Sequence, residues 1–241
     1  MKFHTQTAGQ SLTAQQPLNN VVRVTIQALA GVLGGTQSLH TNSFDEALAL
    51  PSEEAVRVAL RTQQIIAEES GAADIVDPLG GSFAVEALTD EVEAEALAYI
   101  EEIREMGDGS MVEGVLSGIE SGYFHREIGD AAYEYQRRVE EEREVVVGVN
   151  AYEIGEETEP EVLKVDEAVQ ERQRSRLEAV KSERDDAAVE AALAAVDEAI
   201  ANDENVMEPI VAAVKVYATM GEIMAVFEEH HGSYQETASA V

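Results

Sequence analysis

The spacing of apolar and polar positions predicts a strand, a helix and a second strand at the start of this 241-residue chain. Residues 3–9 and 36–42 are short β-prone runs that end in hydroxyls and amides. Between them, apolar residues recur at helical spacing from Pro17 until Gly34 and Gly35 end the helix. This order is typical of a parallel α/β fold, in which side chains at the carboxyl ends of the strands bind ligands.

The rest of the chain has mainly helical periodicity. Asp45 to Leu50 is predicted as a short helix closed by Pro51, and a longer helix begins at Ser52 and ends near Ser70. Residues 71–82 are predicted as a loop. The further predicted elements are helices over residues 88–100, 111–119, 128–139 and 166–202 (one long or two stacked), a helical pair over residues 206–229, and a strand over residues 145–149. We expect three regions, 1–82, 83–155 and 156–241, with a short linker at residues 155–161.

The charge of the chain is strongly one-sided. Asp and Glu total 48 against 16 Lys and Arg, which gives a formal net charge of −32. Such self-repulsion is tolerated most easily where salt shortens the Debye length to about 3 Å at 1 M, so the composition favours the cytoplasm of a halophile. An acidic disordered tail is the alternative, but a hydrophobic content of 45% in helical periodicity argues against general disorder.

Several function classes lack a sequence signal. Without cysteine there is no disulfide framework, thiolate chemistry or cysteine-based metal site. No basic patch is present to neutralise phosphates, so we expect no nucleic-acid partner, and no apolar run of eighteen residues predicts a membrane span. Serine nucleophile elbows, phosphate loops and dinucleotide fingerprints are absent, and His230 and His231 are adjacent, so they do not converge on one metal ion.

Candidate binding residues gather at the predicted strand ends. Gln6 and Gln37 are amides in β-prone runs, and they can both donate and accept hydrogen bonds. Asn42 and Glu46 are four residues apart around the strand-to-helix turn, so both can reach the same end of the sheet, while Gly9 lets backbone approach a ligand. The alternatives are polar groups that satisfy one another, a helix-stabilising glutamate and a plain turn glycine.

A set of motifs in one order resembles the acyl-CoA mutases of the methylmalonyl-CoA mutase type, over nearly the whole chain. The motifs are Phe-His-Thr-Gln-Thr-Ala-Gly (3–9), Ser-Leu-Thr-Ala-Gln-Gln-Pro (11–17), Asn-Asn-Val (19–21), Gly-Gly-Thr-Gln-Ser-Leu-His-Thr-Asn (34–42), Arg-Thr-Gln-Gln-Ile (61–65), Asp-Pro-Leu-Gly-Gly-Ser (77–82), Val-Gly-Val-Asn (147–150) and Val-Leu-Lys-Val (162–165). Unrelated motifs that share an order are more specific than any single one.

The resemblance implies a fold and missing partners. It identifies the chain as the C-terminal half of a large catalytic subunit, with residues 1–82 forming the C-terminal part of a (β/α)8 TIM barrel and a mainly α-helical extension following. The family's substrate-carboxylate residues belong to the first half of that barrel. No Asp-x-His-x-x-Gly motif of a cobalamin-binding domain occurs here. An upstream half and a separate small cobalamin-binding chain are therefore implied, with no catalytic residue in this chain and no activity alone.

The resemblance also assigns binding residues. It places His4, Gln6 and Gln37 along the channel for an acyl-CoA substrate, and it assigns adenosylcobalamin contacts to Gly9, Glu46, Ala49, Asn42 and Gln6. Gln10 departs from the family pattern, in which many relatives carry tryptophan beside the glycine. His40 is expected to support the binding residues from the same side of its strand. No metal ligands are assigned.

The implied reaction is a radical carbon-skeleton rearrangement by an isomerase, such as methylmalonyl-CoA to succinyl-CoA. It begins with homolysis of the cobalt–carbon bond of the cofactor, while the protein binds, orients and excludes water. The competing hypotheses are an inactive acidic helical subunit that serves assembly, and a truncated gene product.

Overall fold

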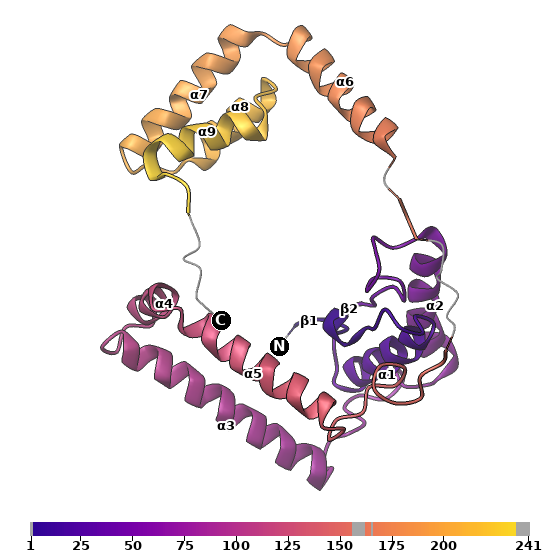
Figure 1. The fold of residues 1–241 in the computed structure, drawn as a ribbon. Coiled ribbons are helices and arrows are strands. Elements are labelled where there is room, and N and C mark those ends of the chain that lie inside the picture. The colour runs from indigo at the N-terminus through magenta and orange to yellow at the C-terminus, as the bar shows by residue number, and fades with distance from the viewer. Residues whose placement is uncertain (1, 156–161, 165, 235–241) are drawn as a thin grey trace. The chain divides into compact units, whose positions relative to one another are not determined.

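The computed structural model describes residues 2–155, 162–164 and 166–234 (Figure 1). The chain divides into two compact units, Met1–Leu163 and Lys164–Ala238. The first is an α/β unit with a small parallel sheet, and the second is helical. No helix in the described parts of the chain is both long and apolar enough to cross a membrane.

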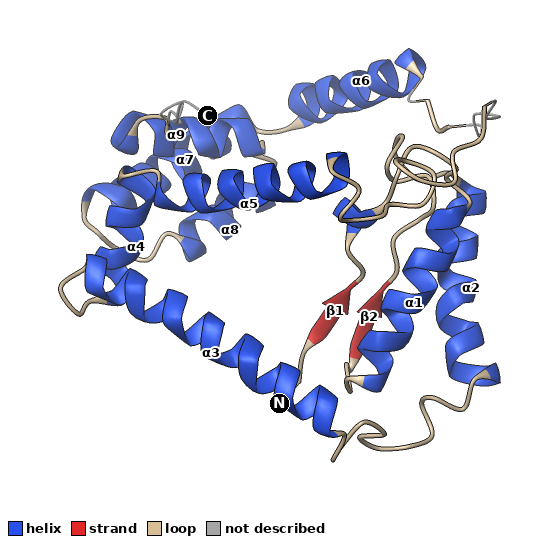
Figure 2. Cartoon of the chain, turned by 60° about the horizontal axis from the view of Figure 1, so that its bottom comes forward, coloured by secondary structure: helices blue, strands red, loops and turns tan. Residues whose placement is uncertain are grey.

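Strands β1 (His4–Gln6) and β2 (Ser38–His40) form a parallel pair joined through helix α1 (Asn19–Leu33), as the periodicity predicted (Figure 2). His4 pairs with Ser38 and Gln6 pairs with His40. Because side chains alternate along a strand, these four polar residues share one face, and all four are exposed.

The opposite face of the sheet packs on α1. Thr5 and Leu39 are half-buried there, and a Cβ added to Gly31 would lie 3.2 Å from Cγ2 of Thr5. A side chain in place of the Gly31 hydrogen would therefore lie tightly against Thr5, which would have to shift by a few tenths of an ångström. Val24 and Ala28 of the same helix are buried at 2% and 0% exposure, so α1 is held by its apolar stripe.

Helix α2 (Glu53–Glu69) begins where the sequence indicated. The Ser52 side chain caps it by accepting a hydrogen bond from the Ala55 N–H at 3.2 Å. The predicted short helix over residues 45–50 is wrong, since that segment is a turn. The Asp45 carbonyl accepts from the N–H groups of Leu48 and Ala49, and the Asp45 carboxylate accepts from the Ser52 N–H at 2.8 Å, which bends the chain into α2 instead of extending a helix.

Three helices follow the loop over residues 71–82: α3 (Phe83–Met106), α4 (Met111–Glu120) and α5 (Tyr123–Glu140). Helix α4 packs closely on α3. A Cβ on Gly114 would lie 1.9 Å from the Ile103 carbonyl oxygen, so only glycine fits at this crossing. Helix α3 buries no residue fully.

The predicted strand over residues 145–149 is wrong. The segment forms a turn with one isolated bridge between Val147 and Ala151. Gly148 has a φ of +84°, and the Asn150 side chain closes the turn by accepting from the Val146 N–H at 2.8 Å and donating to the Val139 carbonyl at 2.8 Å. The predicted linker at residues 155–161 lies outside the described residues, except Gly155.

The second unit contains α6 (Glu167–Glu183), α7 (Asp186–Ala201), α8 (Met207–Lys215) and α9 (Met220–His231). Residues 166–202 therefore form two helices, which was one of the two predicted forms. Helices α7, α8 and α9 share an apolar core. Its buried members are Val189, Val196, Ala213, Ala218 and Ile223.

Candidate functional site

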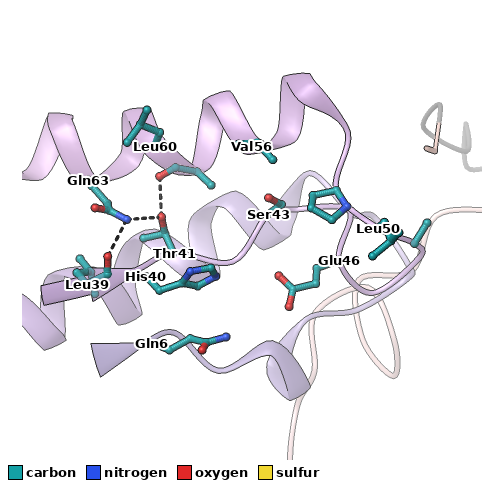
Figure 3. A pocket seen from close by; sticks show the side chains of 13 residues that line it. Gln6, Leu39, His40, Thr41, Ser43, Glu46, Leu50, Val56, Leu60 and Gln63 are labelled. Atoms are coloured by element: carbon teal, nitrogen blue, oxygen red, sulfur yellow. Dashed lines mark hydrogen bonds between the residues drawn. The ribbon is translucent and has the colours of Figure 1, made fainter. Parts of the chain in front are cut away.

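A pocket of about 650 Å³ opens at the carboxyl ends of β1 and β2 (Figure 3). The strands, the turn after β2 and the first half of α2 form its walls. Its lining residues are Gln6, Leu39, His40, Thr41, Ser43, Glu46, Ala49, Leu50, Pro51, Val56, Ala59, Leu60 and Gln63. This is the edge where parallel α/β folds bind ligands.

Hydrogen bonds fix α2 against the end of β2. The buried Thr41 hydroxyl donates to the Ala59 carbonyl at 2.8 Å. The Gln63 amide donates to the Thr41 hydroxyl at 2.9 Å and to the Leu39 carbonyl at 3.2 Å, and Figure 3 shows both bonds. The helix and the strand end therefore form one wall of the pocket.

Three of the predicted cofactor residues meet beside the pocket. The Asn42 amide donates to Oε1 of Glu46 at 2.7 Å. A Cβ added to Gly9 would lie 3.1 Å from the Asn42 amide nitrogen and 3.5 Å from Oε1 of Glu46. Asn42 is buried at 2% exposure, whereas Glu46 is exposed and lines the pocket. Gly9 thus leaves room for the amide and carboxylate to pair.

Gln6 and His40 stand side by side on the exposed face of the sheet and both line the pocket. Neither side chain makes a hydrogen bond to another described residue. Their polar groups are available to a ligand together with Oε2 of Glu46, which also has no hydrogen-bond partner among the described residues. Figure 3 shows these three side chains around one space. Ala49, the fifth predicted cofactor residue, lines the same pocket.

His4 and Gln37 lie away from this pocket, at the start of the strands. His4 hydrogen-bonds the Ser38 hydroxyl. The Gln37 amide accepts from the Phe3 N–H at 2.8 Å and donates to the Gly35 carbonyl at 2.5 Å, so its polar groups are satisfied by backbone. Gln37 lines a separate hollow of about 350 Å³ that it shares with residues of α1 and α2.

Two buried polar residues that sequence reasoning missed support the site. Thr7, 4% exposed, exchanges hydrogen bonds with Asn42. Asp45, 1% exposed, ties the turn that carries Glu46 to the start of α2. The sequence offered only the position of Thr7 at a strand end as a signal, because its partner lies 35 residues away.

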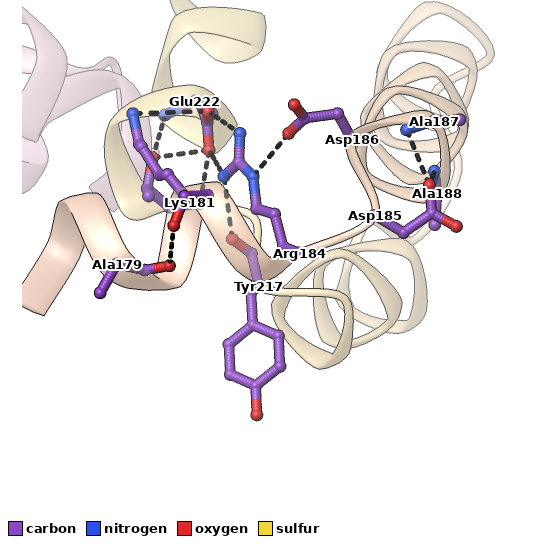
Figure 4. A network of polar contacts seen from close by, with 11 residues as sticks. Ala179, Lys181, Arg184, Asp185, Asp186, Ala187, Ala188, Tyr217 and Glu222 are labelled. Carbon is purple, nitrogen blue, oxygen red and sulfur yellow. Dashed lines mark hydrogen bonds and ion pairs between the residues drawn. The ribbon is translucent and has the colours of Figure 1, made fainter.

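A second polar network lies in the helical unit (Figure 4). The Arg184 guanidinium donates to both oxygens of Glu222, at 2.8 and 2.7 Å, and also to Asp186 and the Tyr217 carbonyl. Glu222 further accepts from the N–H and hydroxyl of Thr219. Hydrogen bonds from Arg184, then from Thr219, hold the pKa of the Glu222 carboxyl far below its usual value. Because the Arg184 guanidinium and the Glu222 carboxylate are both paired with neighbouring protein groups, we assign this network a structural role.

The described residues contain no group of three or more histidine, cysteine, aspartate or glutamate side chains able to hold a metal ion. The polar groups of the pocket are amides, hydroxyls, an imidazole and one carboxylate. They suit an organic ligand with hydroxyl and amide groups.

Comparison with known proteins places this arrangement in a family. The sequence model described as methylmalonyl-CoA mutase matches residues 1–233. The chain belongs to the methylmalonyl-CoA mutase family. This membership covers both units and includes all the residues of the pocket.

Similar members of the methylmalonyl-CoA mutase family come from bacteria and animals. The chain is 47% identical to the 2-hydroxyisobutanoyl-CoA mutase large subunit of Aquincola tertiaricarbonis over 98% of its length. It is 46% identical to the methylmalonyl-CoA mutase of Escherichia coli (strain K12) over 95%, and 44% identical to the mitochondrial methylmalonyl-CoA mutase of Homo sapiens over 100%. The chain spans 42%, 31% and 32% of these proteins, respectively.

Proposed function

We propose that this chain forms part of an adenosylcobalamin-dependent acyl-CoA mutase, an isomerase that converts methylmalonyl-CoA to succinyl-CoA. The observation that carries the proposal is the meeting of Gln6, Gly9, Asn42 and Glu46 at the carboxyl end of the parallel strands. Family membership supports it independently. When bound, adenosylcobalamin supplies the radical chemistry, and the protein supplies binding and orientation.

The residues of the site fit that cofactor. The absent side chain of Gly9 lets the Asn42–Glu46 pair pack against its backbone, and a backbone without a side chain can also approach a flat macrocycle closely. Oε2 of Glu46 can accept from a ribose hydroxyl, and the Gln6 amide can pair with the amide side chains of a corrin. Ala49 adds a small apolar contact in the pocket wall.

The polar face of the sheet supports the proposed acyl-CoA site. His4, Gln6, Ser38 and His40 form a continuous exposed row over both strands. Such a row suits the amides of a pantetheine arm. We assign His4, Gln6 and Gln37 to this channel, with Gln37 acting mainly by holding the strand start that carries His4.

The proposal includes a larger assembly in a halophile's cytoplasm. A two-stranded parallel sheet has unpaired edges, so we place residues 1–82 in a (β/α)8 barrel completed by an upstream half of the catalytic subunit. A small cobalamin-binding chain is the other partner. Residues 83–155 form the helical segment that follows, and residues 156–241 form the charged extension. The reacting groups of the substrate then meet side chains from the partners.

Reconstitution tests the proposed function directly. The chain is mixed with the upstream half, the cobalamin-binding chain and adenosylcobalamin in molar salt, and isomerisation of methylmalonyl-CoA is measured. We expect turnover in the complete mixture and none when this chain is omitted. Ethylmalonyl-CoA, isobutyryl-CoA and 2-hydroxyisobutanoyl-CoA are compared in the same assay. Equal turnover without this chain would refute the proposal.

A second candidate is an assembly subunit without catalytic function. It is favoured by α3, whose Leu88, Val92 and Leu97 are 61%, 66% and 55% exposed although they are apolar. This candidate predicts complex formation that survives loss of the pocket residues, with no cofactor bound. Binding of adenosylcobalamin that depends on Glu46 would decide against it.

A further inference from the structure

A chain of hydrogen bonds links the end of β1 to the Glu46 carboxylate. The Thr7 hydroxyl donates to Oδ1 of Asn42 at 2.5 Å and accepts from the Asn42 N–H at 2.9 Å. The other end of the same amide donates to Glu46 at 2.7 Å. Thr7 and Asn42 are 4% and 2% exposed, so the bonds between these two residues are shielded from water.

The chain defines which way the Asn42 amide points. The Glu46 carboxylate only accepts, so it pairs with Nδ2, and Oδ1 at the other end of the amide accepts the one hydrogen of the Thr7 hydroxyl. The reversed amide would set its oxygen against the carboxylate oxygen of Glu46 at the same distance, and two acceptors repel. Thr7 adds to this preference, because in the reversed amide its hydroxyl hydrogen would lose Oδ1 as its acceptor.

The same geometry separates two roles that the resemblance combined. Asn42 is buried and does not line the pocket, whereas Glu46 is exposed and does. Gly9 lies next to both side chains, and a Cβ added to it would be closer to the Asn42 amide than to the Glu46 carboxylate. Asn42 thus acts on a ligand through Glu46.

We propose that Thr7 is a positioning residue, which orients the Asn42 amide and through it aims the Glu46 carboxylate at the ribose hydroxyls of the cofactor. This inference rests on the proposed function for its ligand. The hydrogen-bond geometry of Thr7, Asn42 and Glu46 does not depend on the proposed function, and it can be measured in the full chain without the cofactor.

The first experiment compares Thr7→Val with Thr7→Ser in the reconstituted assembly. Valine keeps the shape and removes the hydroxyl, and serine restores it. We expect Thr7→Val to weaken adenosylcobalamin binding about tenfold, the typical worth of a lost hydrogen bond, and Thr7→Ser to stay within about threefold of the parent. The KM for acyl-CoA should change less than about twofold, which a general packing defect would not predict.

The matched control is Thr62→Val. Thr62 is also a buried threonine, 7% exposed, but its hydroxyl donates to the Val58 carbonyl of its own helix and is paired with no other described residue. We expect this variant to bind the cofactor like the parent. An equal loss of affinity in Thr62→Val and Thr7→Val would overturn the proposal.

A double-mutant cycle tests whether Thr7 acts through Glu46. In a Glu46→Gln background, Thr7→Val should weaken adenosylcobalamin binding by less than about a further twofold, because the carboxylate that Thr7 positions is already absent. Independent, additive losses would overturn the positioning role. Parent assembly that binds no adenosylcobalamin, or a Glu46→Gln variant that binds it normally, would instead refute the proposed function.

A second measurement keeps the inference testable if the cofactor proposal fails. In the full chain alone, hydrogen exchange of the Asn42 side-chain amide is followed by NMR. We expect slow exchange in the parent and in Thr7→Ser, and exchange at least about tenfold faster in Thr7→Val. An equally protected amide in Thr7→Val would overturn the proposal whatever ligand the pocket takes.

Discussion

The two polar networks of this chain differ in whether their charged groups are paired. In the helical unit, Arg184 and Glu222 make two mutual hydrogen bonds, and the remaining positions are taken by neighbouring protein groups. In the α/β unit, Glu46 accepts one hydrogen bond from Asn42 and keeps its second oxygen at an open pocket.

This difference separates stability from binding. A closed network stabilises the fold because every buried polar group has its partner. An open network retains unpaired groups that a ligand can satisfy, and buried residues behind it set their direction. Substitutions in the Arg184–Glu222 network should lower stability and leave ligand affinity unchanged. Substitutions in the Asn42–Glu46 network should lower ligand affinity and leave stability nearly unchanged.

The largest effect is expected from Glu222→Gln. It removes one of the two carboxylate partners that the described residues give the Arg184 guanidinium, whose side chain is 9% exposed, and leaves Asp186 as the other. Thermal unfolding followed by circular dichroism should show the midpoint of the helical unit falling by more than about 5 °C. The control is Glu171→Gln, which breaks an exposed pair with Arg174 and should shift the midpoint by less than about 1 °C. Equal shifts in the midpoint of both variants would contradict the stabilising role of the Arg184–Glu222 network.

Gly9→Ala should have the next largest effect, on ligand binding. The added methyl would lie 3.1 Å from the Asn42 amide nitrogen and displace the Asn42–Glu46 pair. We expect affinity for adenosylcobalamin in the assembly to fall about tenfold, measured by titration. Gly129→Ala is the control, because its added Cβ meets nothing within 4 Å. Unchanged affinity in Gly9→Ala would remove Gly9 from the site.

A smaller effect separates Gln6 from Gln37. Gln6→Ala removes an amide that lines the pocket and has no hydrogen-bond partner among the described residues, and we expect cofactor affinity to fall about fivefold with little change in stability. Gln37→Ala removes bonds to the backbone of Phe3 and Gly35, so it should lower the thermal midpoint and leave cofactor affinity within about twofold. The reverse pattern would show that the open and closed groups were assigned to the wrong residues.

The smallest effect is the pH dependence of the closed network. The pKa of Glu222 is lowered in the folded state from an ordinary value of 4.5, so its contribution to stability is fully present above that pH and is lost as the pH falls toward the folded pKa. The difference in thermal midpoint between parent and Glu222→Gln should be constant from neutral pH to about 5 and should narrow below it. A difference that widens in acid would contradict this sign.

Local signals in the sequence were sufficient for much of the fold. Apolar spacing, the Gly34–Gly35 stop and the Ser52 cap gave β1, α1, β2 and α2, because each depends on residues a few positions apart. The pairing of Asn42 with Glu46 was predictable for the same reason, since the two residues are separated by one turn.

The features that the sequence did not predict depend on contacts between residues far apart in the chain or on unusual backbone conformations. Residues 145–149 have a β-branched composition, but the positive φ of Gly148 and the Asn150 side chain make a turn. Thr7 reaches Asn42 across 35 positions, and Arg184 reaches Glu222 across 38. Periodicity carries no information about such pairs, so the support of the site became visible only in three dimensions.

A crystal structure of the reconstituted assembly with adenosylcobalamin would test most directly whether Glu46 binds the ribose of the cofactor. The measured quantity is the distance between the Glu46 carboxylate and the ribose hydroxyls of the cofactor. We predict a hydrogen bond of about 2.5 to 3.0 Å, with Asn42 still bonded to Glu46 and to Thr7. A cofactor bound elsewhere, with Glu46 facing solvent, would contradict the account.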